Sequence, residues 1–210
     1  GLIGLFWLGL AAAALTEVLE LTDPPVITAV SGLLVSFPAL ASTFAYVFTL
    51  DGYMLALFLA ILAVLFTKKY EKGWLAGAVC LAFSMGTYQA YLPFAILLCV
   101  YVILLFFMET KGFRDKAVYV LRYLGMGAAG ATLYYVILQI LLKLQGKVLD
   151  TYQGINSMEH GSGQGLFATV KGMYLDFLAF TVHGNVLVNN IFSLAACAVL
   201  VLLTAYLLIR

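Results

Sequence analysis

The chain has 210 residues, of which 64% are hydrophobic and 10% are charged, and its formal net charge is +1. So few polar side chains could not cover the surface of a soluble globule, which indicates an integral membrane protein surrounded by a lipid bilayer. Neither the net charge nor any basic run interleaved with aromatic residues points to a nucleic-acid partner.

The predicted elements are helices, because the apolar runs extend over about 16 to 26 residues, unlike the alternating segments of about ten residues in an outer-membrane barrel. We expect an all-α fold, a polytopic transmembrane helical bundle of about seven spans. The predicted spans are residues 1–21, 25–48, 51–66, 74–89, 91–108, 117–142 and 186–209.

The breaks between the first spans are T-D-P-P (22–25) and T-L-D-G-Y (49–53), since proline suits the first turn of a new helix. Pro38 and Pro93 lie within apolar runs and predict kinks or short breaks there. The chain opens inside one apolar run and closes on I-R after another, so we expect residues 1–210 to be a single transmembrane domain and a fragment of a longer protein.

Most basic residues lie in K-K-Y-E-K (68–72) and E-T-K-G-F-R-D-K (109–116), which the positive-inside rule places in the cytoplasm. Two loops on one side require an even number of crossings between them. The uncharged run from Trp74 to Phe107 would reach roughly 51 Å as one helix, against a hydrocarbon core of about 30 Å. We therefore predict a helical hairpin, with Y-Q-A-Y (88–91) at its outer turn.

The same parity places residues 49–53 and 143–185 on the outer face. Within the second segment, residues 165–182 carry an apolar stripe at helical spacing, which favours a helix lying in the outer interface over a spanning one. The preceding polar stretch, residues 150–165, is predicted to be a flexible connector, and a mobile loop that covers substrate is the alternative.

Two motifs are interpreted structurally. G-M-G-A-A-G (125–130) has the spacing of a dinucleotide-binding loop but lies inside a predicted span, where small residues let helices pack closely. His160 and His183 have no partners at ligand spacing, and Cys80, Cys99 and Cys197 are expected to pack as small hydrophobic residues. We predict no metal and no cofactor.

The candidate site residues lie on the predicted outer face. Asp51 either holds a sugar hydroxyl or caps the helix expected to begin at Gly52, and the cap is the favoured interpretation. Tyr88, Gln89 and Tyr91 offer aromatic faces and amide hydrogen bonds to a sugar or a lipid headgroup. Tyrosines equally belong to the aromatic belt of a membrane interface.

The order of three segments resembles the membrane glucosyltransferase family of bacterial O-antigen serotype conversion. The segments are V-S-F-P-A-L-A-S-T-F-A-Y-V-F-T-L-D-G-Y-M-L-A-L-F-L-A (35–60), K-K-Y-E-K (68–72) and F-S-M-G-T-Y-Q-A-Y-L-P-F (83–94). The likeness extends over residues 25–110 and weakens after residue 117. It implies a GT-C type enzyme that moves a hexose, expected to be glucose, from a polyprenyl-phosphate sugar to a glycan acceptor on the outer side of the bacterial cytoplasmic membrane.

In such a reaction a carboxylate accepts the proton of the acceptor hydroxyl, and hydrogen-bond donors stabilise the departing phosphate. GT-C enzymes generally keep their essential acidic residues in the first outer loop, so the main catalytic Asp is expected to lie outside this chain, with Asp51 in an auxiliary role. The candidate substrate-binding residues are Asp51, Tyr53, Tyr88, Gln89, Tyr91, Glu159 and His160. The alternatives are a transporter or flippase for a lipid-linked sugar and a non-catalytic membrane scaffold.

Overall fold

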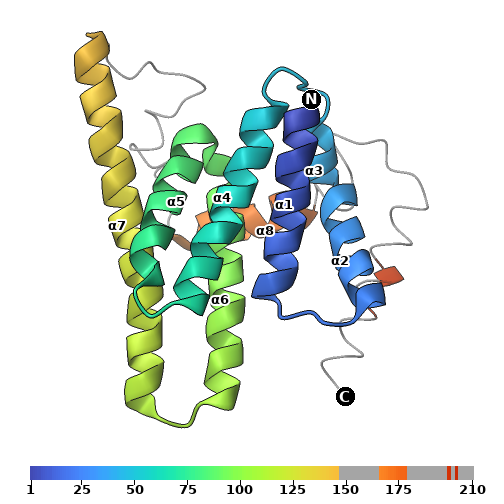
Figure 1. Ribbon diagram of the computed structural model, residues 1–210, viewed down its shortest axis with the longest axis vertical. Coiled ribbons are helices and arrows are strands. Elements are labelled where there is room, and N and C mark those ends of the chain that lie inside the picture. Colours follow the sequence, from blue (N-terminus) through green and yellow to red (C-terminus); the bar gives the residue numbers. More distant parts are fainter. Residues whose placement is uncertain (147–165, 179–197, 200–201, 203–210) are drawn as a thin grey trace. The chain divides into compact units, whose positions relative to one another are not determined.

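The computed structural model describes residues 1–146 and 166–178, together with residues 198, 199 and 202. The chain divides into two units, Gly1–Val148 and Leu149–Arg210. Within the described residues every regular element is a helix, so the predicted all-α class is confirmed (Figure 1). The elements are α1 (Leu2–Val18), α2 (Pro24–Ser36), α3 (Pro38–Thr43), α4 (Leu50–Lys69), α5 (Gly73–Thr87), the 3-10 helix η1 (Gln89–Tyr91), α6 (Leu92–Glu109), α7 (Phe113–Gln145) and α8 (Leu166–Leu178).

Proline residues lie at three helix starts. The N–H groups of a first turn have no partner within the helix, so the N–H that proline lacks is not missed there. Prolines occupy the first or second position of α2, α3 and α6. Phe37, before Pro38, has an extended ψ of 127°, as expected for a residue that precedes proline. The predicted break at Pro38 is therefore confirmed, and the predicted span 25–48 is divided between two helices, since α2 ends at Ser36 and α3 at Thr43.

Three helical stretches are long and apolar enough to cross a bilayer: Leu50–Lys69, Gln89–Glu109 and Phe113–Gln145. Helices α1, α2 and α5 are apolar but have only 10–17 residues each. These helices indicate membrane association, and the count of seven spans stays a prediction. The predicted span 186–209 lies outside the described residues except at positions 198, 199 and 202.

The core of the first unit forms around α4, which packs between α1 and α5 (Figure 1). Met54, Leu57, Ile61 and Val64 of α4 are almost completely buried. Ser84 of α5 donates a hydrogen bond to the carbonyl oxygen of Ala56 in α4, 2.8 Å away, so its polar group is satisfied in the core. In a bilayer such buried apolar side chains stabilise helix association through van der Waals packing.

Glycines allow α5 to approach its two neighbours closely. A Cβ at Gly77 would lie 2.7 Å from the carbonyl oxygen of Ala63 in α4, and one at Gly130 of α7 would lie 3.1 Å from that of Ala78 in α5. A Cβ at Gly125 would contact the Trp74 ring at 3.6 Å, whereas one at Gly127 would meet open space. The interpretation of residues 125–130 as a helix-packing motif is confirmed at Gly125 and Gly130.

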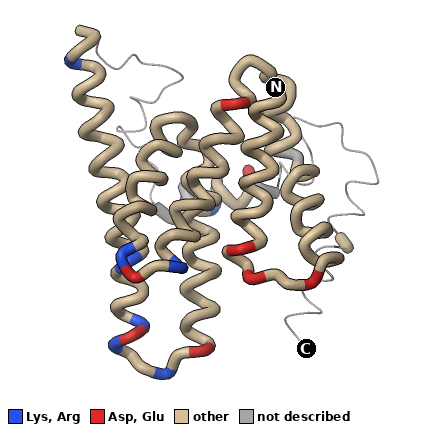
Figure 2. The backbone as a smooth tube through the Cα atoms, in the orientation of Figure 1, with Lys and Arg blue, Asp and Glu red and all other residues tan. Residues whose placement is uncertain are grey.

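The uncharged run from Trp74 to Phe107 is divided as predicted, because α5 ends at Thr87 and α6 begins at Leu92 after the short helix η1. In Figure 1, α4 and α6 run toward the same end of the first unit, and the loops that carry Lys68–Lys72 and Glu109–Lys116 both follow there. Figure 2 shows that charged residues gather mostly near helix ends and in loops. This distribution is consistent with the prediction that the two basic loops lie on the same side of the membrane.

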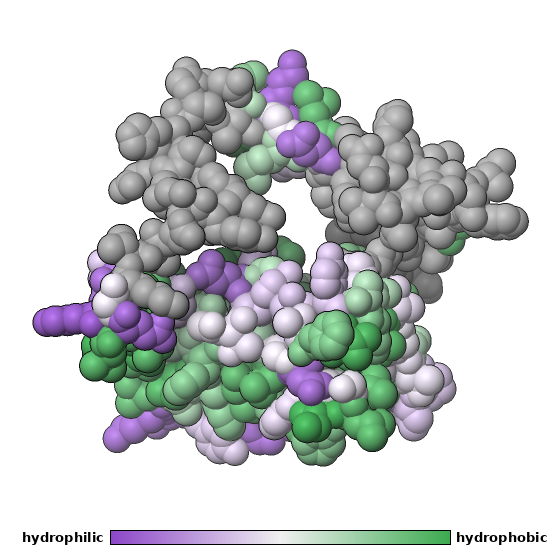
Figure 3. All heavy atoms as spheres, turned by 90° about the horizontal axis from the view of Figure 1, so that it is seen from above, coloured by the Kyte–Doolittle hydropathy of each residue, from purple (hydrophilic) through white to green (hydrophobic). Residues whose placement is uncertain are grey.

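Much of the visible surface of the described helices is apolar (Figure 3). Large exposed hydrophobic side chains include Leu5, Leu33, Leu97, Leu104 and Leu121. Such a surface fits hydrocarbon better than water.

In the second unit, α8 covers Leu166–Leu178, so a helix is present within the predicted range 165–182. Its position in the membrane interface stays a prediction. The connector at residues 150–165 lies outside the described residues.

Candidate functional site

Three of the predicted site residues form an aromatic cluster at the end of the first unit where α4 begins and α5 ends. The rings of Tyr53 and Tyr88 have centroids 4.4 Å apart with an interplanar angle of 45°, and those of Tyr88 and Tyr91 are 5.4 Å apart at 69°. A Cβ at Gly52 would lie 3.5 Å from Cγ2 of Thr87, so the two helix ends are in contact. We call the end of the unit that carries Tyr53, Tyr88 and Tyr91 the tyrosine end.

An apolar cavity of about 480 Å³ adjoins this cluster. Side chains of α1, α2, α3, α4 and α6 form its walls, among them Leu34, Phe37 and Phe94, and Tyr88 and Tyr91 line it as well. Thr43 also lines it, but its hydroxyl donates a hydrogen bond to the carbonyl oxygen of Leu40 at 2.6 Å. The cavity is therefore apolar over most of its wall, with tyrosines at one side.

The hydroxyl of Tyr91 is buried and has no hydrogen-bond partner among the described residues. Leaving a buried polar group unsatisfied costs about 1–3 kcal/mol. Such a hydroxyl is stabilised when it donates a hydrogen bond to a ligand oxygen. Tyr91 is thus the residue of the cluster with an unused hydrogen-bonding group.

Asp51 makes a different contact from the one predicted. It lies in the first turn of α4, and its Oδ1 accepts a hydrogen bond from the backbone N–H of Gly4 in α1 at 2.6 Å. Asp51 therefore caps a helix, as favoured, but the prediction that it caps its own helix is wrong, since α4 begins at Leu50 and has no side-chain cap. Asp51 does not line the cavity.

Gln89 points to another neighbour. Its Nε2 donates a hydrogen bond to the hydroxyl of Tyr134 in α7, 2.5 Å away. Gln89 does not line the cavity either, so the structure brings together Tyr53, Tyr88 and Tyr91 and leaves Asp51 and Gln89 in separate contacts. Sequence reasoning missed Tyr134, whose only signal is the Tyr134-Tyr135 pair in the second half of a predicted span.

Two further predicted site residues, Glu159 and His160, lie outside the described residues. Over residues 1–146 and 166–178, no three His, Cys, Asp or Glu side chains gather in an arrangement that could hold a metal ion. The chemistry of the described site is therefore that of aromatic rings, hydroxyl groups and apolar walls.

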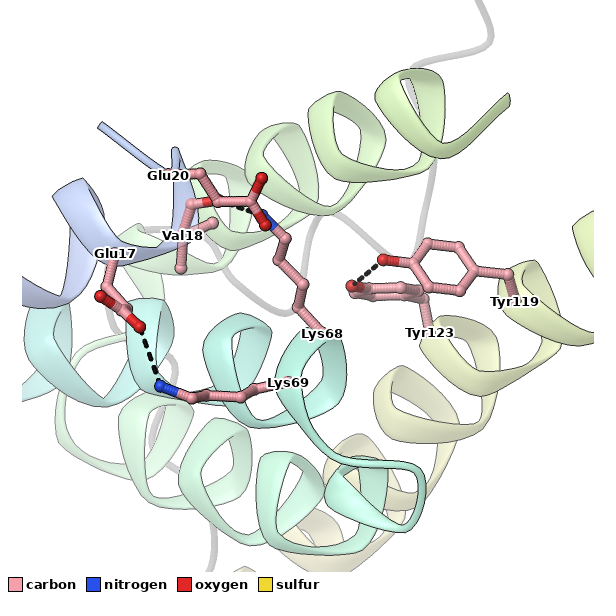
Figure 4. A network of polar contacts seen from close by, with 7 residues as sticks. All are labelled: Glu17, Val18, Glu20, Lys68, Lys69, Tyr119 and Tyr123. Atoms are coloured by element: carbon pink, nitrogen blue, oxygen red, sulfur yellow. Dashed lines mark hydrogen bonds and ion pairs between the residues drawn. The ribbon is translucent and has the colours of Figure 1, made fainter. Parts of the chain in front are cut away.

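The opposite end of the unit carries Lys68, Lys69 and Lys72, and we call it the lysine end. Nζ of Lys68 donates a hydrogen bond to the carbonyl oxygen of Val18 at 2.6 Å and forms an ion pair with Oε1 of Glu20 at 2.8 Å (Figure 4). Lys69 pairs with Glu17 at 2.8 Å. These contacts connect the last turn of α4 to the end of α1. A cation at the end of α1 also stabilises the partial negative charge on the free carbonyl groups of that helix.

Arg122 of α7 has a similar role at the end of α4. Its guanidinium donates to the carbonyl oxygen of Thr67 at 2.8 Å and also to that of Tyr70. The Tyr119 ring lies 5.9 Å from the guanidinium carbon, within the range of a cation–π contact. Arg122 therefore fixes α7 against the C-terminal end of α4.

The described residues thus define an all-helical, membrane-associated protein with a tyrosine-lined apolar cavity. A family model described as glucosyl transferase GtrII matches residues 1–210. The chain therefore belongs to the glucosyl transferase GtrII family, and the predicted resemblance to a membrane glucosyltransferase family is confirmed. No curated protein and no solved structure matches the chain significantly.

Proposed function

We propose that the chain is part of a GT-C type glucosyltransferase that moves glucose from a polyprenyl-phosphate carrier to a cell-surface glycan on the outer side of the bacterial cytoplasmic membrane. Membership of a glucosyl transferase family supports the reaction class, and the apolar helices support a lipid-linked donor. The tyrosine end is the outer end in this proposal, since the basic loops follow the opposite ends of α4 and α6.

The observation that carries the proposal is the buried, unpartnered hydroxyl of Tyr91 beside an apolar cavity. A polyprenyl-phosphate sugar has a long apolar tail and a polar head, so it needs an apolar channel that ends at hydrogen-bond donors. The walls around Leu34, Phe37 and Phe94 suit the isoprenoid units next to the phosphate. The Tyr91 hydroxyl then donates to a phosphate oxygen, and Tyr88 stands beside it.

The chemical step in this proposal is an attack of the acceptor hydroxyl oxygen on the anomeric carbon of glucose. A carboxylate accepts the hydroxyl proton, the bond from the anomeric carbon to the phosphate oxygen breaks, and the polyprenyl phosphate leaves with the bonding electrons. The Tyr91 hydroxyl stabilises the charge that grows on the phosphate. We assign the catalytic base to none of the described residues, and Asp51 has a positioning role because one of its oxygens is held by Gly4.

The test is Tyr91→Phe in the full-length enzyme, which removes the hydroxyl and keeps the ring. We expect the affinity for polyprenyl-phosphate glucose and the transfer rate to fall by roughly 10- to 100-fold, as for the loss of one hydrogen bond to a charged group. Tyr101→Phe is the matched control, because Tyr101 is on the same helical segment but is 41% exposed and does not line the cavity.

Unchanged binding and transfer in Tyr91→Phe would exclude this cavity as the donor site. The transport alternative makes a different prediction for the same reconstituted protein. A flippase moves the lipid-linked sugar between leaflets when no glycan acceptor is present, whereas the transferase consumes the donor only when the acceptor is added.

A further inference from the structure

A second cavity, of about 560 Å³, lies at the lysine end of the first unit between α1, α4, α6 and α7. Its wall is of two kinds. Apolar side chains from α4 and α6 line one part, among them Leu65, Leu105 and Phe106, and charged side chains line the other. An amphipathic cavity of this kind fits a molecule with an apolar tail and a charged head better than a small ion.

The charged part of the wall has spare hydrogen-bond donors. An ammonium group has three N–H bonds. The described contacts of Lys68 use two of them, and the described contact of Lys69 uses one. Both ammonium groups therefore retain N–H groups for a further acceptor, and two neighbouring cations with free donors suit the oxygens of a phosphate.

The same wall has a spare acceptor. Glu17 and Glu20 are paired with the two lysines, whereas Glu109, at the end of α6, forms no ion pair with any described residue. The three carboxylates and two ammonium groups leave one excess negative charge in the lining. A purely anionic ligand is disfavoured by this excess, and a ligand that also brings a cation is favoured.

Tyr119 completes the charged side from α7. Its ring stacks on Phe106 with centroids 3.9 Å apart and an interplanar angle of 13°, so the two rings are held in place. The Tyr119 hydroxyl lies 3.2 Å from that of Tyr123 (Figure 4). The Tyr119 ring offers a further surface to an ammonium group.

We propose that this cavity binds a zwitterionic phospholipid whose headgroup carries a primary ammonium, of the phosphoethanolamine class. The phosphate contacts Lys68 and Lys69, the ammonium pairs with Glu109, and an acyl chain lies along Leu105 and Phe106. The primary amine matters because its N–H groups can donate to the Glu109 carboxylate, which a trimethylated amine cannot do. The site is separate from the proposed donor cavity and does not depend on the glucosyl transfer.

The test uses the full chain in bilayers that contain equal amounts of phosphatidylethanolamine, phosphatidylcholine and phosphatidylglycerol. The lipids retained after gentle release are identified by native mass spectrometry. We expect phosphatidylethanolamine to be retained over the other two by about fivefold, the factor that corresponds to an ion pair worth roughly 1 kcal/mol. The proposal is overturned if the three lipids are retained equally, or if phosphatidylcholine is retained as well as phosphatidylethanolamine.

Glu109→Gln tests the assignment of the ammonium contact, and we expect it to remove most of the preference. Glu71→Gln is the matched control, since Glu71 is an exposed carboxylate near the same end and does not line the cavity. A Glu109→Gln protein that keeps the preference contradicts the proposed contact. The comparison among lipids on the unaltered chain does not depend on how either variant folds.

Discussion

The carboxylate of Asp51, in the first turn of α4, accepts a hydrogen bond from the backbone N–H of Gly4, in the first turn of α1. The free N–H groups at the start of a helix carry a partial positive charge, so an acidic side chain stabilises them. Two core helices are thus held together at the tyrosine end by a contact between residues far apart in the sequence.

Replacement of Asp51 is expected to reduce stability more than it reduces the chemical step. Asp51→Ala should lower the free energy of unfolding by about 1 kcal/mol, the usual effect of losing a helix cap, and Asp51→Asn should lower it less because the amide oxygen can still accept the bond. Thermal unfolding in detergent measures the effect. An Asp51→Asn protein of full stability without transfer activity would instead show that the carboxylate takes part in catalysis.

Gly4 should tolerate no larger residue. A Cβ at this position would lie 2.9 Å from Oδ1 of Asp51 and 3.0 Å from Cγ of Leu50, so Gly4→Ala must displace the cap or separate α1 from α4. We expect a loss of about 1–3 kcal/mol. Gly9→Ala in the same helix is the control, since nothing lies within 4 Å of a Cβ there, and it should be neutral or stabilising by up to about 1 kcal/mol. Equal unfolding temperatures for the two variants would contradict the described packing.

Variants of Gln89 and of its partner Tyr134 test whether Gln89 has a structural role or binds the substrate. Their hydrogen bond joins η1 to α7, and either Gln89→Ala or Tyr134→Phe should lower the free energy of unfolding by about 0.5–1.5 kcal/mol. The double variant should lose little more than one single variant, because the two residues act through one bond. If Gln89→Ala abolishes donor binding while Tyr134→Phe leaves it intact, Gln89 binds the substrate itself.

Arg122 should not be replaceable by lysine. Its guanidinium reaches the carbonyl oxygens of both Thr67 and Tyr70, and the compact ammonium of lysine does not reproduce this planar arrangement. We expect Arg122→Lys to lower the free energy of unfolding by about 1–2 kcal/mol and Arg122→Ala by more. Arg114→Lys serves as the control, because Arg114 is exposed in the first turn of α7 and should respond little. Stability of Arg122→Lys equal to that of the parent protein would contradict the capping role.

Local chemistry explains which parts of this fold are predictable. Pro38 lacks an N–H and restricts Phe37, so the break between α2 and α3 could be predicted from the sequence alone. The turn at residues 88–91 followed from the length of the uncharged run and the distribution of basic residues. Tyr88 and Tyr91 were predicted together because they are close neighbours in the chain.

The remaining contacts of the site depend on helix packing. Asp51 and Gly4 are 47 positions apart, and Gln89 and Tyr134 are 45 apart. No periodicity or capping pattern indicates which of several helix starts a carboxylate will reach. The cap was therefore predicted correctly in kind and wrongly in its helix, and Tyr134 was missed altogether.

Helix α7 has 33 residues, which corresponds to a length of about 50 Å, against a hydrocarbon core of about 30 Å. Transmembrane helices tilt by up to about 40°, and at that tilt α7 still extends over roughly 38 Å along the bilayer normal. If α7 crosses the bilayer, tilting alone cannot place all of it in hydrocarbon, and at least one full turn must lie in the headgroup layer or in water. In that arrangement the charged residues near its ends, such as Arg114 and Lys143, would fix its depth, and α7 would set the level of the shorter helix α5 that packs against it.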